Sequence, residues 1–377
     1  MKVVIAGGGT GGHLFPGLAV AEELRGRGHE VHFVGTEQGI EAKVIPGQNF
    51  GLDFIDVRGL KGANLRGRLQ TLTALPRALY QSLTILRRVK PQLVLGVGGY
   101  ASGPVLVAAE LVGLPTAILE QNSIPGITNR TLGKIVDLVF GTFAAAVRYF
   151  PEQKYRLMGN PVRQQIRDLY SARPELVEGA STSLRAAQGE RFLLVMGGSQ
   201  GAQAVNDLVC GAMAILAAKK KAPTLLHQTG ANDLARVQAL YQTSQVAVTV
   251  TAFIDDVASA LAQSELVVSR AGATTLSELH LAGVPAILIP YPHAADDHQT
   301  SNARACEEKG AAIVCVQEAT TAESLAKTID DLLSNKALLA EMERRARQLS
   351  RPRAHLEIVD ALEALAGLHP AGVPSVS

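Results

Sequence analysis

The same short pattern, an apolar strand that runs into a glycine-rich turn and then a helix, occurs in both halves of this chain. It is seen first in "KVVIAGGGTGGHLFPGLAV", from residue 2, and again in "RFLLVMGGSQGAQAVNDLV", from residue 191. Glycines at such a turn let the backbone approach a ligand closely, and the first N–H groups of the helix then point at that ligand. Two such turns, each followed by more strands and helices, constrain the chain to an α/β fold.

The strand-like runs along the chain indicate a parallel, doubly wound sheet in each half. In the first half they are "KVVIA", "EVHFVG", "LVLGVG", "PTAILE" and "LVFGT", with helices starting near Leu14 and Pro104. The second half adds "RFLLVM", "PTLLHQTG", "VAVTVTAF", "ELVVSRAG", "PAILIPYP" and "AAIVCV". We therefore predict two Rossmann-like domains that face a cleft, with ligands outside the carboxyl ends of the strands.

The domain boundaries are predicted from changes in composition. Residues 1–163 form the first domain and residues 164–340 the second, in which the polar, turn-rich "SARPELVEGASTS" at 171–183 is interpreted as an insertion. The apolar spacing near the end predicts a helix at 341–366 that joins the first domain. Residues 367–377 are predicted to be a disordered tail.

Bulk composition argues against several classes of protein. The net charge of +2 over 377 residues gives no general basis for nucleic-acid binding. Cys210, Cys306 and Cys315 are an odd set without a C-x-x-C pair, which is typical of reduced thiols in a cytosolic protein. No secretory signal precedes the first strand, and no apolar run reaches the roughly 18 residues of a membrane span. We expect a soluble or peripheral protein.

The first glycine turn matches the spacing of a dinucleotide-binding turn. Gly7, Gly9 and Gly12 fit G-x-G-x-x-G. A dinucleotide site also needs an acidic residue at the end of the second strand, where it binds the ribose. Here that strand ends at Gly35, and Glu37 comes two residues later. The misplaced acid counts against a nicotinamide-dependent oxidoreductase or binding protein, which stays as an alternative.

His13 follows the last of these glycines, at the predicted start of a helix. A helix N-terminus disfavours a protonated imidazole, which helps to keep the ring neutral and able to accept a proton. A general base needs that state at working pH. A lone histidine is more often structural, so only its position on the glycine turn favours catalysis.

The second half offers two turns suited to phosphate. Ser199, in "GGSQGA", adds a hydroxyl to a row of backbone N–H groups at a helix start. Another strand ends at Ser269, and a helix begins around 273–275, where a diphosphate can dock. Glu278 lies about one turn further in, and its carboxylate can accept from two ribose hydroxyls. The alternative is a solvated or capping glutamate.

The loop "DDHQTSNA" contains side chains of the kind that bind metal ions. Asp296, Asp297 and His298 are potential ligands, but adjacent acids point in different directions, and the chain contains no D-x-D. That absence favours a diphosphate bound by helix dipoles and backbone donors, without a metal or other cofactor. Gln299 and Asn302 suit sugar hydroxyls, because amides both donate and accept.

Two further loops follow strands of the first half. "GVGGYASGP" at 96–104 is a third glycine turn that enters a helix and could hold another phosphate. "EQNSIPGITNR" places Glu120, Gln121, Asn122 and Asn129 at the predicted edge of the cleft. Amide and carboxylate side chains there are suited to sugar hydroxyls.

A basic stripe is the least expected feature of the sequence. No acidic residue occurs from Val57 to Ala109, and leucines recur there every three or four residues. Its cations are Arg58, Lys61, Arg66, Arg68, Arg77, Arg87, Arg88 and Lys90. The stripe fits contact with an anionic lipid surface or a core-facing helix whose charges are solvated, and the residues alone leave both open.

Taken in order, these motifs resemble one family. "GGGTGGHLFPGLAVAEEL", "GVGGYASGP", "EQNSIPGITNR", "GNPVR", "GGSQGA", "FIDDV", "SRAGATTLSEL" and "DHQTSNA" look like the bacterial peptidoglycan N-acetylglucosaminyltransferases of the MurG type, from residue 1 to about residue 350. The resemblance implies a GT-B fold and inverting transfer of N-acetylglucosamine from its UDP donor to the muramoyl 4-hydroxyl of lipid I, giving lipid II. It implies a peripheral enzyme of cell-wall synthesis and cell division on the cytoplasmic face of the inner membrane. Another GT-B enzyme with a lipid or small-molecule acceptor is the alternative.

The resemblance also implies roles for individual residues. His13 and Glu120 are the candidate bases, and Gly98, Gly99, Tyr100 and Ser102 the acceptor-diphosphate site. Donor contacts are expected at Thr10, Gly11, Gly12, Asn122, Arg163, Ser199, Ile254 (through its backbone, to uracil), Ala273, Thr274, Thr275, Leu276, Ser277, Glu278 and Gln299. Membrane contact is expected at Arg66, Arg68, Leu79, Leu83, Arg87, Arg88 and Lys90. The chain departs from the family at Leu119, where histidine is common, and in lacking tryptophan.

Overall fold

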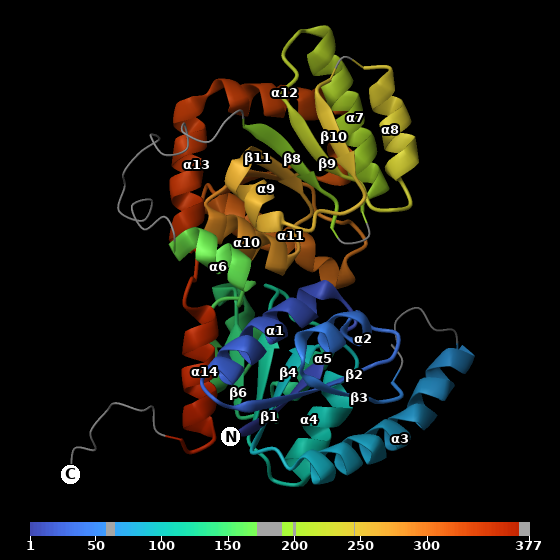
Figure 1. The fold of residues 1–377 in the computed structure, drawn as a ribbon, viewed down its shortest axis with the longest axis vertical. Helices are drawn as coiled ribbons and strands as arrows, with labels where there is room; N and C mark the ends of the chain where they lie inside the picture. The colour runs from blue at the N-terminus through green and yellow to red at the C-terminus, as the bar shows by residue number, and fades with distance from the viewer. Residues whose placement is uncertain (58–64, 172–190, 199–200, 245, 369–377) are drawn as a thin grey trace, which may run out of the picture. The chain divides into compact units, whose positions relative to one another are not determined.

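The structure is a computed structural model that describes residues 1–57, 65–171, 191–198, 201–244 and 246–368. It forms two compact units (Figure 1). Unit 1 is Met1–Arg163 with Arg351–Ser377, and unit 2 is Gln164–Ser350. Ser199, all but the first residue of the predicted insertion, and residues 369–377 of the predicted tail lie outside the described residues.

Unit 1 is built on a parallel sheet of seven strands in the order β3-β2-β1-β4-β5-β6-β7. The strands are β1 (Lys2–Gly7), β2 (Glu30–Gly35), β3 (Gly51–Phe54), β4 (Leu93–Gly98), β5 (Thr116–Glu120), β6 (Leu138–Gly141) and β7 (Tyr155–Leu157). Alternate residues of β1 serve opposite faces, as strand geometry requires. Val3 and Ile5 pack with the helices at 11–26 and 354–365, and Val4 and Ala6 pack with the helices at 65–89 and 102–111.

The helices of unit 1 cover both faces of its sheet (Figure 1). They are α1 (Gly11–Gly26), α2 (Glu41–Val44), α3 (Leu65–Val89), α4 (Ser102–Leu111), α5 (Ile127–Leu132) and α14 (Ala354–Leu365), with short 3-10 helices η1 (Ile45–Gln48), η2 (Ala144–Tyr149) and η3 (Glu152–Lys154). α1 begins three residues before the predicted Leu14, so His13 lies inside its first turn.

Unit 2 contains a parallel sheet of six strands in the order β10-β9-β8-β11-β12-β13. The strands are β8 (Phe192–Met196), β9 (Leu225–Gln228), β10 (Val248–Thr251), β11 (Ser264–Ser269), β12 (Ala286–Leu288) and β13 (Ala312–Val314). Its helices are α6 (Gln164–Ser171), α7 (Gln203–Ala218), α8 (Leu234–Gln242), α9 (Val257–Gln263), α10 (Ala273–Ala282), α11 (His298–Glu308), α12 (Ala322–Ser334) and α13 (Lys336–Leu349), with η6 (Ala295–Asp297) and η7 (Gln317–Ala319).

Each sheet has one point where the strand order reverses, between β1 and β4 in unit 1 and between β8 and β11 in unit 2. Ligands of open α/β sheets bind at such switch points, outside the carboxyl ends of the strands. Four of the turns predicted to carry chemistry follow these four strands. The predicted fold class, α/β with two Rossmann-like parallel sheets, is confirmed.

The C-terminal segment is two helices instead of the single predicted helix at 341–366. α13 ends at Leu349 inside unit 2, and α14 begins at Ala354 inside unit 1. The break contains Pro352, which disfavours a helical conformation for the residue before it. The change of unit therefore falls after Ser350 and not at the predicted residue 340.

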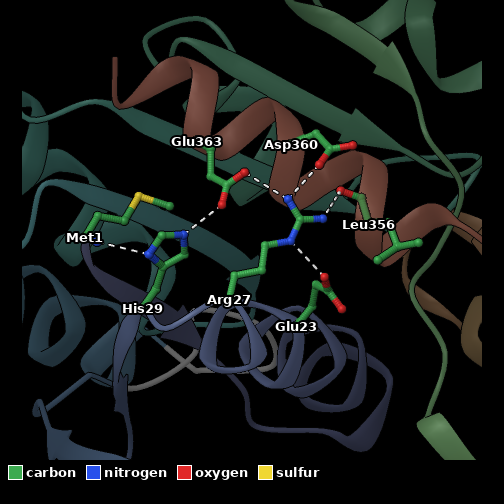
Figure 2. Close-up of polar contacts among 7 residues, drawn as sticks. All are labelled: Met1, Glu23, Arg27, His29, Leu356, Asp360 and Glu363. Carbon is green, nitrogen blue, oxygen red and sulfur yellow. Dashed lines mark hydrogen bonds and ion pairs between the residues drawn. The ribbon is translucent and has the colours of Figure 1, made fainter. Parts of the chain in front are cut away.

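Polar side chains hold α14 on the end of α1 (Figure 2). The Arg27 guanidinium donates to Glu23 of its own helix and to Asp360 and Glu363 of α14, at 2.6–2.8 Å. His29 Nε2 lies 2.8 Å from the same Glu363, and its Nδ1 lies 3.0 Å from the N-terminal amine. The last helix is thus tied to the first strand and helix of unit 1.

Candidate active site

The two glycine turns of unit 1 pack backbone against backbone. The N–H of Gly8 donates to the carbonyl of Gly98 at 3.2 Å. A Cβ atom on Gly7 would lie 2.2 Å from that carbonyl oxygen, and one on Gly99 would lie 2.4 Å from the oxygen of Gly8. Side chains are therefore excluded sterically, and the turns after β1 and β4 form one surface.

His13 stands on this surface, half-buried. Its Nδ1 lies 3.2 Å from the Thr10 hydroxyl, which precedes α1. The ring lies against the second turn, because a Cβ atom on Gly98 would be 2.7 Å from His13 Cδ2. The hydroxyl and the glycine backbone orient the imidazole in the first turn of α1. This is the arrangement that a general base requires.

Ser102 does not face a ligand, in contrast to the acceptor-phosphate role predicted for it. The side chain is fully buried, donates to the Ala6 carbonyl at 2.7 Å and accepts from the Gly98 N–H at 3.0 Å. It therefore ties β1 to the turn after β4. Of the other residues predicted to contact that phosphate, Gly98 is buried, Gly99 is half-buried, and Tyr100 is 52% exposed.

Glu120 is also enclosed, at 2% exposure. One carboxyl oxygen accepts from the backbone N–H of Asn122 at 2.8 Å, and the other from Asn129 Nδ2 at 2.9 Å. Burial raises the pKa of Glu120 to about 7, against the opposing effect of these hydrogen bonds. The group therefore positions the loop after β5 and is poorly placed to take a proton from a substrate. Of the two predicted bases, the geometry favours His13.

The remaining predicted donor contacts of unit 1 lie on or beside these turns. Gly11 and Gly12 form the first turn of α1, and the half-buried Asn122 is held by Glu120 through its backbone. The Arg163 guanidinium lies over the ring of Phe15, 4.8 Å from its centroid, which attaches the end of unit 1 to α1.

Glu41 is a residue that the sequence interpretation missed. It begins α2, is 1% exposed, and accepts from the Gly9 N–H at 2.7 Å. Its other oxygen accepts from the Thr36 N–H at 2.8 Å and from the Thr36 hydroxyl at 3.0 Å. The acid near the end of β2 is therefore buried, and both of its oxygens accept hydrogen bonds from the protein itself. It is not offered to a ribose, which argues against the dinucleotide alternative.

Neutral amides hold a turn of unit 2 at its switch point, which joins β11 to α10. Gln299 Oε1 accepts from the N–H groups of Ala271 (3.3 Å) and Tyr291 (3.0 Å). Asn302 Nδ2 donates to the Ala271 carbonyl at 3.3 Å. Gln299 was predicted to contact a sugar, but its carbonyl oxygen is used by the backbone. Both amides lie in the first turns of α11 (His298–Glu308) and not in the predicted loop.

α10 carries the predicted diphosphate and ribose residues. Its N-cap is Gly272, which has no side chain to cap the helix. Ala273, Leu276 and Glu278 are buried, whereas Thr274, Thr275 and Ser277 are half-buried. Glu278 is 4% exposed, so the solvated alternative is wrong. Ile254, predicted to hold uracil, is half-buried before α9.

Arg270 is a second residue that the sequence interpretation missed. It follows β11 and donates through Nη1 to the carbonyls of Ile289 and Pro290, both at 3.0 Å. Nη2 donates to Gln317 Oε1 at 2.8 Å, and burial lowers the pKa of the guanidinium. Arg270 thereby ties the turn after β11 to the end of β12.

The basic stripe is partly neutralised by acids that precede it in sequence. Arg88 forms an ion pair with Asp53 of β3, and Arg77 forms one with Asp56 at 2.8 Å. Leu79 and Leu83 pack against the core, contrary to an outward membrane role. Arg87 and Lys90 are exposed, and the side chains of Arg66 and Arg68 lie outside the description.

On α3, the apolar side chains described as exposed are Leu75 and Tyr80, at 40% and 71%. No helix in the described ranges is both long and apolar enough to cross a membrane. The same part of the chain contains no group of three or more His, Cys, Asp and Glu residues that could hold a metal ion. Asp296 and Asp297 both have positive φ, as uncommon backbone conformations in the loop before α11.

Two family descriptions match most of the chain. The N-terminal domain of glycosyltransferase family 28 matches residues 3–141, and the C-terminal domain of that family matches residues 192–358. A UDP-N-acetylglucosamine–N-acetylmuramyl-(pentapeptide) pyrophosphoryl-undecaprenol N-acetylglucosamine transferase of Myxococcus xanthus is 49% identical over 364 residues, which are 96% of this chain and 92% of the relative. The transferase of the same name from Anaeromyxobacter sp. strain Fw109-5 is 46% identical over 362 residues, with the same coverage.

A solved structure gives the same result. The crystal structure of Acinetobacter baumannii MurG is similar with a TM-score of 0.77 and 33% identity, over 96% of this chain and 99% of that one. Sequence identity at this level over nearly the full length supports more than a shared fold. This chain therefore belongs to glycosyltransferase family 28, among its UDP-N-acetylglucosamine–N-acetylmuramyl-(pentapeptide) pyrophosphoryl-undecaprenol N-acetylglucosamine transferases.

Proposed function

We propose that this enzyme transfers N-acetylglucosamine from UDP-N-acetylglucosamine to the 4-hydroxyl of the muramoyl sugar of lipid I, giving lipid II for peptidoglycan. The names of relatives that are 46–49% identical over almost the whole chain support this substrate pair. The observation that carries the mechanism is His13, oriented by Thr10 at the start of α1 on a glycine surface.

The reaction is a single displacement. His13 removes the proton from the acceptor hydroxyl as its oxygen attacks the anomeric carbon, opposite the UDP leaving group. The anomeric C–O bond to the diphosphate breaks, and the configuration is inverted. The Thr10 hydroxyl orients the imidazole ring for the proton transfer. The backbone of Gly98 lies close to the ring and carries no side chain.

The donor is assigned to unit 2. The N-terminus of α10 offers partial positive charge and backbone donors to the UDP diphosphate, and Glu278 accepts from the ribose hydroxyls. Charge that develops on the departing diphosphate is stabilised there by preorganised dipoles. The lack of a D-x-D pair in the sequence supports transfer without a metal ion. Activity unchanged by a strong chelator is the expected result.

The acceptor is assigned to unit 1, with its diphosphate near Gly98–Tyr100, and the lipid to the cytoplasmic membrane surface. The exposed cations Arg87 and Lys90 and the exposed Tyr80 on α3 support contact with anionic headgroups. A direct test compares turnover of a lipid I analogue with that of a diglyceride acceptor. Transfer to the diglyceride alone would show a different glycosyltransferase activity.

A further inference from the structure

Glu41 is an unusual group for a glycine-rich turn, because it is a carboxylate enclosed by backbone. Both oxygens accept hydrogen bonds, from the Gly9 N–H and from the N–H and hydroxyl of Thr36. In the described part of the chain, no cation forms an ion pair with it. A buried carboxylate is tolerated only where such donors replace its water, so the position of this group is defined by the two turns that it joins.

Three glycines make room for the carboxyl group. A Cβ atom on Gly8 would lie 2.2 Å from its Oε2, and one on Gly39 would lie 2.2 Å from both oxygens. A Cβ atom on Gly35 would lie 2.4 Å from its Cγ. These glycines come from the turn after β1, from the end of β2 and from the segment between β2 and α2, so these segments are shaped around one side chain.

The same turn leads directly to the proposed base. Gly9 is followed by Thr10, whose hydroxyl contacts His13, and Gly8 is bonded to the Gly98 carbonyl beside the His13 ring. Gly7, Gly8 and Gly9 all have positive φ. Because glycine allows many backbone conformations, the turn adopts a single one only where other groups hold it. Glu41 holds the middle of that path at Gly9.

We propose that Glu41 is a positioning residue for the reaction: its carboxyl group fixes the turn after β1 and thereby places Thr10 and His13. This inference rests on the proposed function in assigning the proton transfer to His13. It assigns Glu41 no contact with either substrate. The residue acts through the backbone of Gly9.

Two substitutions perturb the contacts of Glu41 in different ways. Glu41→Gln keeps the volume but replaces one acceptor oxygen with a donor, which must face the N–H of Gly9 or of Thr36. Gly39→Ala keeps the carboxyl group and displaces it, because the new Cβ would collide with both oxygens and Gly39 does not require positive φ. Gly47→Ala is the matched glycine control, since its Cβ would meet nothing within 4 Å. Glu363→Gln is the matched carboxylate control in unit 1.

The experiment combines steady-state kinetics on UDP-N-acetylglucosamine and a lipid I analogue with backbone amide exchange of the full chain. We expect kcat to fall about 100-fold in both Glu41→Gln and Gly39→Ala, the scale of a misplaced catalytic group, with the donor KM unchanged. The amide of Gly9 or Thr36 should exchange faster in Glu41→Gln, and both amides should do so in Gly39→Ala. Both controls should keep kcat.

Three results would overturn the proposal. These are a kcat that stays normal while the Gly9 or Thr36 amide exchanges faster, unchanged exchange of both amides in Glu41→Gln, and an equal loss of kcat in Glu363→Gln at equal loss of stability. Failure of the proposed function would look different. In that case the unaltered enzyme would not transfer the sugar to lipid I, or His13→Ala would remain active. Amide exchange at Gly9 would still show whether Glu41 holds the turn.

Discussion

The turns after β1 and β11 each follow a strand at the switch point of their sheet, but they are held in different ways. A buried carboxylate, that of Glu41, fixes the first at Gly9. The amides of Gln299 and Asn302 fix the second at Ala271. The first turn holds a carboxylate, whereas the second is held by two amides and the Arg270 guanidinium and leads to the N-terminus of α10. This difference fits a first turn that orients a base and a second that receives a diphosphate.

The largest expected effect concerns the first turn. His13→Ala should lower kcat by about 10²–10⁴-fold, because it removes the general base. UDP-N-acetylglucosamine binding, measured by calorimetry, should change little, since the second turn holds the nucleotide. A variant with near-normal turnover, or one that loses donor affinity in proportion to kcat, would contradict this division of roles between the two turns.

The two units should also differ in their response to pH, and Glu120 makes the contribution of unit 1. Burial raises its pKa from 4.5 to about 7, so folding favours the protonated form. This stabilisation is complete below pH 4.5 and is lost as the pH rises through 7, which amounts to about 3 kcal/mol. Chemical unfolding of the enzyme and of Glu120→Gln at pH 5 and pH 8 should show that the substitution removes this loss. If the free energy of unfolding changed equally between pH 5 and pH 8 in both proteins, Glu120 would not be the source of this pH dependence.

In unit 2 the corresponding group is His227, which is fully buried between Tyr241 and Asn206. Burial lowers its pKa from 6.5 to about 4, so folding favours the neutral ring. Its stabilisation is present above pH 6.5 and is lost as the pH falls through 4, again about 3 kcal/mol. Amide exchange measured separately for each unit should become faster in unit 2 as the pH falls, and His227→Gln should make this exchange less dependent on pH. If exchange in unit 2 of the variant still became faster in acid, His227 would not be its cause.

Glu278→Gln tests the second turn. Hydrogen bonds to a charged group contribute about 1.5–3 kcal/mol, so the Kd for UDP-N-acetylglucosamine should rise roughly 10- to 100-fold. Calorimetry measures this, and the acceptor KM should not change. Glu265→Gln is the control in the same unit, since Glu265 forms only a surface ion pair with Lys336. Equal effects on donor and acceptor would argue against the ribose role.

The smallest expected effect is at the membrane. Arg87→Gln with Lys90→Gln should weaken flotation with anionic vesicles roughly 30-fold, at about 1 kcal/mol per charge. Lys327→Gln removes an exposed cation from unit 2 and should leave flotation unchanged. Flotation that is unaffected by the double variant, or by added salt, would contradict membrane contact through α3.

Much of the fold could be predicted from the sequence, because long apolar runs and glycine turns report directly on buried parallel strands. β3 and β7 were missed, since four and three residues of mixed polarity give no periodic signal. The start of α1 was placed too late because glycines are poor helix formers. The break before α14 was overlooked although Pro352 marks it.

The candidate site was predicted less completely, because spacing along the chain does not reveal what a side chain contacts. By spacing, Glu37 is the acid nearest the end of β2, whereas the buried carboxylate is that of Glu41 on the next helix. Ser102 and Glu120 have the residue types expected of ligands but bind the protein's own backbone. Asp53 and Asp56 precede the basic stripe, and only the fold brings them onto α3.

The central claim is that the nucleotide belongs to the turn of unit 2 and the base to the turn of unit 1. A crystal structure with UDP bound tests it most directly. We expect the diphosphate at the N-terminus of α10, with the ribose hydroxyls on the Glu278 carboxylate. A diphosphate seated on Gly7–Gly9, with Glu278 contacting no ribose oxygen, would contradict it.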